Sequence, residues 1–180
     1  VPISTPGWDN APYMSSSHFI TKSPVDGTYN NGNYRAQLKA PDRLGFNPSI
    51  EHHTGGYLHW LEWKELGEPM PCAVVLGCPP IVSFTSVQKL PHGLDEHHVS
   101  GGLVNAPLHM VKAKTIDLLV PADAEVVVEG FISTEWLEPE APFGESHGHV
   151  NLQEYNGFMD VTAITRKKNA VITSWVSQVT

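Results

Sequence analysis

The longest strand candidate in this sequence, residues 124–137, leads directly into a segment that cannot be a regular helix. That segment spans residues 138–149 and holds two prolines and two glycines, which interrupt helices. It also holds three carboxylates and two imidazoles. We predict a rigid loop whose side chains point at one place, where neighbouring carboxylates raise one another's pKa and supply a general acid near neutral pH. The alternative is an acidic turn that faces solvent.

Strand patterns outnumber helix patterns in the rest of the chain. Helices are predicted for 57–66, which Gly67 ends, and for 94–104, which begins near Asp95. The continuous apolar run 73–76 predicts a buried strand. The other predicted elements are a hairpin of 13–21 and 28–40 around a turn at 24–27, a strand or helix start at 81–87, strands at 107–113 and 116–120, and a closing hairpin of 159–165 and 170–176. We therefore predict one α+β domain over residues 1–180, mainly β, as a barrel with helical insertions.

Charge and cysteine content exclude several classes of partner. A net charge of −8 argues against binding to nucleic acid or to an anionic membrane, and no apolar run is long enough to span a bilayer. Cys72 and Cys78 lack the spacing of a zinc or redox pair and are expected to stay reduced, as in the cytoplasm. Because the chain shows neither a secretory signal nor an initiator Met, a processed product or an excised fragment is expected.

Polar residues in three places suggest a metal site. The run Asn30–Asn33 interrupts a strand candidate and predicts a bulge where the backbone approaches a ligand, or else a surface loop. His53 lies beside two glycines, and Glu96 lies at a predicted helix start. Asparagine oxygen, histidine nitrogen and glutamate oxygen together suit Mn²⁺ or Mg²⁺. The alternative is that each side chain is merely packed or exposed.

Arg35 follows the asparagine run on the same strand candidate. A guanidinium at that position can hold a substrate carboxylate through two hydrogen bonds. It can equally form a surface ion pair that contributes little stability. The sequence contains no nucleophile elbow, no phosphate-binding glycine loop and no dinucleotide fingerprint.

Several motifs resemble, in order along the chain, those of the UbiD family of reversible decarboxylases that use prenylated flavin. The segment 140–145, Glu-Ala-Pro-Phe-Gly-Glu, resembles that family's Glu-Gly-Pro-Phe-Gly-Glu motif, with Ala141 as the one departure. The segment 30–35 is similar to its Asn-to-Arg cofactor segment. Further similar segments are 77–80, 90–96 and 121–130.

The resemblance implies a split β-barrel of the FMN-binding type and a set of site residues. A divalent metal, Mn²⁺ or Mg²⁺, would bridge to the flavin phosphate. The implied metal ligands are Asn30, His53 and Glu96, the implied K⁺ ligands are Asn31, Thr85, Ser86 and Gln88, and the implied flavin-lining residues are Asn33, Tyr34, Arg35 and His52. The implied catalytic set is Arg35, Glu140 and Glu145, in which Glu140 is the favoured proton donor and Glu145 the alternative.

The resemblance also implies a reaction and partners. The substrate would be an aromatic or α,β-unsaturated acid that releases or takes up CO₂, and His52 suggests a polar, phenolic or heteroaromatic one. A flavin prenyltransferase would supply the cofactor, and the protein would form a homo-oligomer or join other subunits. Family members carry further N- and C-terminal domains, so the chain is expected to be their central domain. The alternative is a flavin- or metal-binding module that is inactive without its partner domains.

Overall fold

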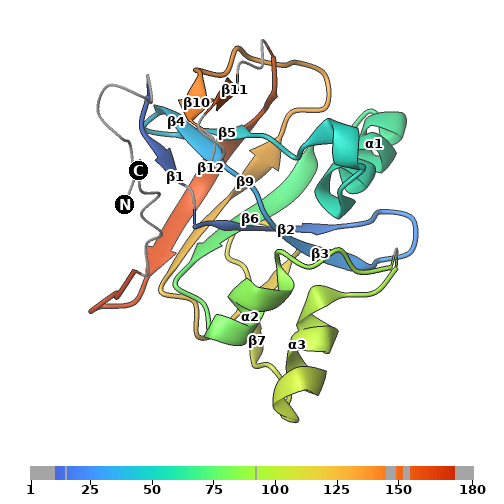
Figure 1. Cartoon of the computed structure of the whole chain (residues 1–180), viewed down its shortest axis with the longest axis vertical. Coiled ribbons are helices and arrows are strands. Elements are labelled where there is room, and N and C mark those ends of the chain that lie inside the picture. The colour runs from blue at the N-terminus through green and yellow to red at the C-terminus, as the bar shows by residue number, and fades with distance from the viewer. Residues whose placement is uncertain (1–10, 15, 92, 145–148, 152–154, 173–180) are drawn as a thin grey trace.

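A computed structural model describes residues 11–14, 16–91, 93–144, 149–151 and 155–172. Its main feature is an eight-stranded antiparallel sheet in the order β1-β4-β5-β12-β9-β6-β2-β3 (Figure 1). In the described chain as a whole, including strands outside this sheet, the strands are β1 (Tyr13–Met14), β2 (His18–Lys22), β3 (Tyr29–Asn33), β4 (Ala36–Ala40), β5 (Arg43–Phe46), β6 (Met70–Leu76), β7 (Met110–Lys112), β8 (Leu119–Pro121), β9 (Val126–Ile132), β10 (Phe143–Gly144), β11 (Val150–Asn151) and β12 (Gly157–Arg166). The helices are the 3₁₀ turn η1 (Ile50–His52), α1 (Gly55–Leu66), α2 (Pro80–Thr85) and α3 (Glu96–Val104).

One long hairpin contributes strands to both ends of this sheet. Its outer part pairs Tyr13 with Gln37 in β1 and β4, and its inner part pairs Lys22 with Tyr29 in β2 and β3. The two parts occupy opposite ends of the strand order, so the sheet must curl to bring its ends together. The predicted mainly-β split barrel with helical insertions is thereby confirmed.

The central strand β6 is apolar throughout because both of its faces are covered. Alternate residues of a strand point to opposite faces, and here the two sets enter separate buried clusters. One cluster, with Phe19 and Phe46, receives Met70, Cys72, Val74 and Leu76; the other, beneath residues 116–120, receives Ala73 and Val75. Both cysteines are free, and burial raises the pKa of each thiol.

The β2–β3 hairpin lies between α1 on one side and α2 with α3 on the other (Figure 1). Because β3 is an edge strand, its outward N–H groups need partners. Asn31 N donates to the Glu96 carboxylate at 2.8 Å, and Asn33 N donates to the Ser86 carbonyl at 3.1 Å. The segment that carries α2 and α3 therefore caps the edge of β3 and positions Glu96 against it.

Both predicted helices are confirmed. The first is α1, which ends where Gly67 adopts a left-handed conformation and its N–H bonds to the last turn. The second is α3, where Asp95 caps the helix by accepting from His97 N at 2.7 Å. The ambiguous segment 81–87 is largely helical, as α2, because Pro80 occupies its first turn. No helix among the described residues is long and apolar enough to cross a membrane.

Several predicted strands differ from the structure. The strands predicted at 107–113 and 116–120 are shorter, as β7 and β8. The strand predicted over 124–137 ends at Ile132, since the Ser133 hydroxyl accepts from Trp136 N at 2.9 Å and turns the chain. In the closing hairpin, the first arm is β12, which pairs with β9 and β5. Residues 170–172 form no strand, and the rest of the predicted second arm lies outside the described residues.

His18 on β2 predicts an acid-sensitive fold. Burial, and then the nearby His97 charge, lower the pKa of His18 from 6.5 to about 4. The folded state therefore takes up its proton at lower pH than the unfolded state, and stability falls as the pH drops below 6.5. Between pH 7 and pH 5 the wild type should lose about 2 kcal/mol more than His18→Gln in urea denaturation. Parallel pH profiles for the two proteins would contradict this.

Candidate functional site

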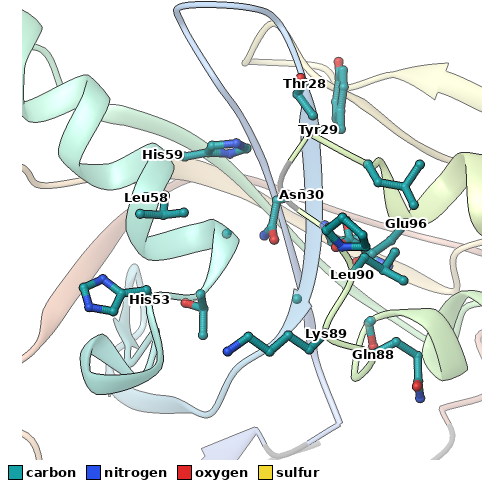
Figure 2. Close-up of a pocket in the computed structure, with 18 of the residues that line it drawn as sticks. Thr28, Tyr29, Asn30, His53, Leu58, His59, Gln88, Lys89, Leu90 and Glu96 are labelled. Carbon is teal, nitrogen blue, oxygen red and sulfur yellow. The ribbon is translucent and has the colours of Figure 1, made fainter.

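A cavity of about 500 Å³ lies between β3, the start of α1 and the segment 86–96 (Figure 2). The residues predicted to bind flavin, divalent metal or K⁺ line it, except Arg35 and Thr85. The lining members of that set are Asn30, Asn31, Asn33, Tyr34, His52, His53, Ser86, Gln88 and Glu96. The fold thus brings together side chains that are separated by up to 66 positions in the sequence.

The predicted bulge at Asn30–Asn33 is wrong. These residues are part of β3, which pairs with β2 at every position from Tyr29 to Asn33 without a register shift. The strand tolerates them because its edge N–H groups have partners in the 86–96 segment. The interruption comes at Arg35, which forms only an isolated bridge with Asn47 between β3 and β4.

On one side of the cavity, the start of α1 packs closely against β3 and the following Tyr34. A Cβ added to Gly55 would lie 2.1 Å from Asn30 Oδ1, and a Cβ on Gly56 would lie 2.8 Å from the Tyr34 ring. Gly56 N donates to the Tyr34 hydroxyl at 3.1 Å. Burial raises the pKa of Tyr34, which keeps this hydroxyl protonated and able to donate in turn.

Two of the three predicted metal ligands face the cavity together. Glu96 is 9% exposed, is held against Asn31 N, and has a pKa that burial raises. Asn30 is 7% exposed, and its Nδ2 has no hydrogen-bond partner among the described residues. A hard cation could be coordinated by the Glu96 carboxylate and by the carboxamide oxygen of Asn30.

His53 does not join them. It is exposed, has a left-handed backbone, and its ring lies 6.3 Å from the Tyr57 ring between centroids. In Figure 2 the ring points away from Asn30 and Glu96. No three His, Cys, Asp or Glu side chains within the described part of the chain are grouped closely enough to hold a metal.

The residues implied for K⁺ are only partly assembled. Asn31 Nδ2 donates weakly to the Val82 carbonyl at 3.4 Å, and Thr85 Oγ1 donates to the same carbonyl at 3.1 Å. Asn31 Oδ1 is buried without a partner among the described residues. Gln88, in contrast, points its amide at the Phe84 carbonyl, 3.3 Å away.

Arg35 and Glu140 form a buried, bidentate ion pair. Arg35 Nε donates to Oε1 at 3.0 Å, and Arg35 Nη2 donates to Oε2 at 2.8 Å. The side chains are 13% and 3% exposed, respectively. The Arg35 guanidinium also lies over the Phe143 ring, 4.9 Å from its centroid. Arg35 lies between β3 and β4, and Glu140 lies before β10, 105 positions later. The two charges are fixed relative to each other by this planar geometry.

Two asparagines complete the Glu140 site, and sequence reasoning missed both. Asn47 Nδ2 and Asn156 Nδ2 donate to Glu140 Oε2 at 3.0 Å and 2.7 Å. Each asparagine flanks a strand, β5 or β12, so the only available signal was a polar residue at a strand end. Arg35, Asn47 and Asn156 all bond to the Glu140 carboxylate through N–H donors.

The prediction that the glutamates of 138–149 point at one place is wrong for Glu138. Glu138 binds Arg43 and lies 3.5 Å from Lys39, in a partly exposed network that excludes Glu140. The backbones of Glu138 and Asn156 form a bridge, which turns the two glutamates toward different partners. Glu145 and His147 lie outside the described residues, and His149 is exposed.

Comparison with known proteins identifies a family match over almost the whole chain. Residues 2–179 match the model of the UbiD family, described as the 3-octaprenyl-4-hydroxybenzoate carboxy-lyase Rift-related domain. An uncharacterized protein of Aquifex aeolicus (strain VF5) is 33% identical over 164 residues, which cover 91% of this chain and 33% of that protein.

Two solved structures share the fold closely. An evolved dimeric form of the UbiD-class enzyme HmfF from Pelotomaculum thermopropionicum, in complex with prFMN, superimposes with a TM-score of 0.90 at 29% identity, covering 96% of this chain and 40% of that one. The vanillic acid decarboxylase of Sedimentibacter hydroxybenzoicus, in closed form, has a TM-score of 0.90 at 27% identity, covering 96% and 37%. The chain thus spans about a third to two fifths of the length of these relatives.

Proposed function

The chain belongs to the UbiD family, and from this premise we propose that it is the flavin-binding domain of a reversible decarboxylase that uses prenylated FMN. The proposed substrate is an aromatic or α,β-unsaturated carboxylic acid. The observation that carries the proposal is the buried Arg35–Glu140 pair, which directly follows the cavity-lining residues Asn33 and Tyr34. A guanidinium that is fixed in one plane, next in sequence to residues that line a cavity, suits recognition of a carboxylate.

Each residue of the site has a separate role in the proposed reaction. When bound, the prenylated flavin supplies an electron sink for the bond that breaks as CO₂ leaves. Arg35 orients the substrate carboxylate, and Glu140 keeps the Arg35 guanidinium in one plane through its two hydrogen bonds. Asn47 and Asn156 hold Glu140 in turn.

We assign the proton donor to Glu145 in preference to Glu140. Both oxygens of Glu140 already accept from N–H donors, and a general acid must carry a proton to the substrate. Glu145 is the other carboxylate of the same motif. This assignment reverses the preference that the sequence alone suggested, and the two variants described in the Discussion separate the alternatives.

A divalent metal, Mn²⁺ or Mg²⁺, is proposed on Asn30 and Glu96, with His53 joining after rotation of its exposed side chain. The support is that the Glu96 carboxylate and the Asn30 carboxamide, both buried, line the same cavity. Glu96→Gln should weaken Mn²⁺ binding by about 10- to 100-fold, measured by the electron paramagnetic resonance signal of free Mn²⁺. Glu65→Gln, an exposed change on α1, serves as the control and should bind Mn²⁺ as the wild type does. Equal affinities for all three proteins would contradict the site.

A potassium ion is proposed beside this site, on Asn31, Thr85 and Ser86. Asn31 Oδ1 is buried without a partner among the described residues, and Asn31 and Thr85 converge on one carbonyl. Oxygen ligands of this kind suit a hard cation. Gln88 is left out because its amide is directed at α2.

Narrowing the cavity should impair flavin binding. In Gly55→Ala the new methyl group would displace Asn30, since the Cβ position lies 2.1 Å from its Oδ1. Overpacking of this kind costs about 1–3 kcal/mol, so FMN affinity should fall about 10- to 100-fold in a flavin-fluorescence titration. The matched control is Gly102→Ala, another helix glycine, where a Cβ meets nothing within 4 Å. Wild-type affinity in Gly55→Ala would show that flavin binds elsewhere.

The reaction is tested by isotope exchange. The protein loaded with prenylated flavin is incubated with ¹³C-bicarbonate and each of a panel of aromatic and unsaturated acids. A reversible decarboxylase should place ¹³C in the carboxyl group of at least one acid.

Flavin uptake without exchange into any acid would favour the second candidate function, a flavin-binding module that needs partner domains or subunits. The matched relatives extend well beyond the part that this chain covers. The other proposed partners are a flavin prenyltransferase and further copies of the protein.

A further inference from the structure

The cavity next to β3 is lined by more acidic than basic side chains, which is unfavourable for an anionic ligand. Two carboxylates, Asp26 and Glu96, line it. Among the described lining residues there is no arginine, and the single lysine is Lys89. A ligand that bears a phosphate group would therefore meet a single permanent cation of the protein in this cavity.

The backbone around Lys89 is fixed by short-range hydrogen bonds. Leu90 N donates to the Gln88 carbonyl at 3.1 Å, which makes Lys89 the central residue of a three-residue turn. Gln88 N donates to the Thr85 carbonyl at 3.0 Å, and Pro91 follows the turn. The side chain of Lys89 thus projects from the tip of a turn whose flanks are tied to α2.

Lys89 is directed into the cavity without a protein counter-ion. In Figure 2 its side chain extends from the segment 86–96 toward α1, the helix that carries Leu58 and His59. No carboxylate of the described residues lies within ion-pair distance of its ammonium group. An exposed lysine that crosses a cavity toward a helix instead of pairing with an acid is available to a ligand.

The side of the cavity that Lys89 faces also favours an anion. The N-terminus of α1 lies there, and it has no acidic residue in its first turn and no side-chain cap from Thr54. A helix N-terminus carries partial positive charge. Beside it, the buried Asn30 Nδ2 is a donor without a partner among the described residues, and Figure 2 shows the Asn30 amide pointing into the cavity.

We propose that Lys89 binds the phosphate group of the flavin mononucleotide, together with the N-terminus of α1 and Asn30. This inference rests on the proposed flavin-binding function and adds to it a residue that selects the phosphorylated cofactor over its unphosphorylated form. Lys89 is a binding residue and takes no part in the movement of protons. Its role is to offset the carboxylates of the cavity when a dianionic group enters.

The test compares FMN with riboflavin, which has the same ring system and lacks the phosphate. Fluorescence titrations of the wild type and of Lys89→Met, Lys89→Arg and Lys112→Met are measured with both ligands. Lys89→Met should lose about 10- to 100-fold in FMN affinity, and its riboflavin affinity should stay within about twofold of the wild type. Lys89→Arg should keep most of the FMN affinity. Lys112, exposed on β7, controls for the change in net charge.

The outcomes separate this proposal from the proposed function. A wild type that binds neither ligand would overturn the flavin site itself, and the role of Lys89 with it. A wild type that prefers FMN while Lys89→Met retains that preference would overturn the role of Lys89 alone. So would an equal loss in Lys89→Met and Lys112→Met, because net charge would then explain it. Supporting evidence would be an FMN affinity that falls with added salt more steeply in the wild type than in Lys89→Met.

Discussion

Glu140→Ala is expected to lower the free energy of unfolding by about 3–5 kcal/mol, because it breaks a largely buried ion pair by removing the carboxylate that Arg35 binds through two hydrogen bonds. The variant also removes the acceptor of two buried hydrogen bonds, because Asn47 and Asn156 both donate to Glu140 Oε2. The loss of these two buried hydrogen bonds adds to the loss of stability. Urea denaturation at pH 7, followed by tryptophan fluorescence, measures the change.

A neighbouring glutamate provides the matched control. Glu138→Ala removes an ion pair with Arg43, whose side chain is 37% exposed, so its cost should stay below about 1 kcal/mol. The double variant Arg35→Met, Glu140→Leu replaces both charges with apolar groups and should recover much of the lost stability. If Glu140→Ala is no less stable than Glu138→Ala, the Arg35–Glu140 pair does not hold the fold together at this point.

Glu145→Gln is expected to lower the turnover number by about 10²- to 10⁴-fold while flavin binding is retained, since it removes the proton of the proposed general acid. Glutamine keeps the shape of glutamate but carries no transferable proton. Single-turnover decarboxylation in D₂O, with deuterium at the former carboxyl carbon as the readout, measures the protonation step directly.

Glu140→Gln distinguishes the two candidate acids. Glutamine at 140 can still bond to Arg35 through its oxygen, so positioning is weakened and proton delivery by Glu145 remains. We therefore expect a smaller loss in Glu140→Gln than in Glu145→Gln, and wild-type turnover in Glu138→Gln. Deuterium incorporation that survives in Glu145→Gln but disappears in Glu140→Gln would return the role of proton donor to Glu140.

Much of the fold follows from local sequence patterns. The apolar run of β6 predicted a strand covered on both faces, and two separate clusters do cover it. Asp95 and Gly67 marked a helix start and a helix end, because capping needs particular side chains and backbone conformations. The turn at 24–27 predicted the β2–β3 hairpin correctly. The barrel itself was predicted, but the strand order that closes it did not follow from local patterns. That order depends on which strands the two ends of the hairpin meet.

The sequence predicted which residues belong to the candidate site, but not how their side chains contact one another. The motifs identified Arg35 and Glu140, and they form a bidentate pair across 105 residues. No local pattern indicated Asn47 or Asn156, because their contacts with Glu140 arise only when β5 and β12 pair. The asparagine run was interpreted as a break in a strand, since propensity scales disfavour Asn in strands. Tertiary partners for its edge N–H groups overrode that preference.

The central claim is that this chain holds a prenylated flavin in the cavity beside β3. The most direct test is native mass spectrometry, with a visible absorbance spectrum, of protein co-expressed with a flavin prenyltransferase and purified with Mn²⁺ present. We predict a flavin-like absorption band and a mass increase that matches one prenylated FMN per chain, both reduced in Gly55→Ala. A colourless protein at the mass of the polypeptide alone would contradict the claim.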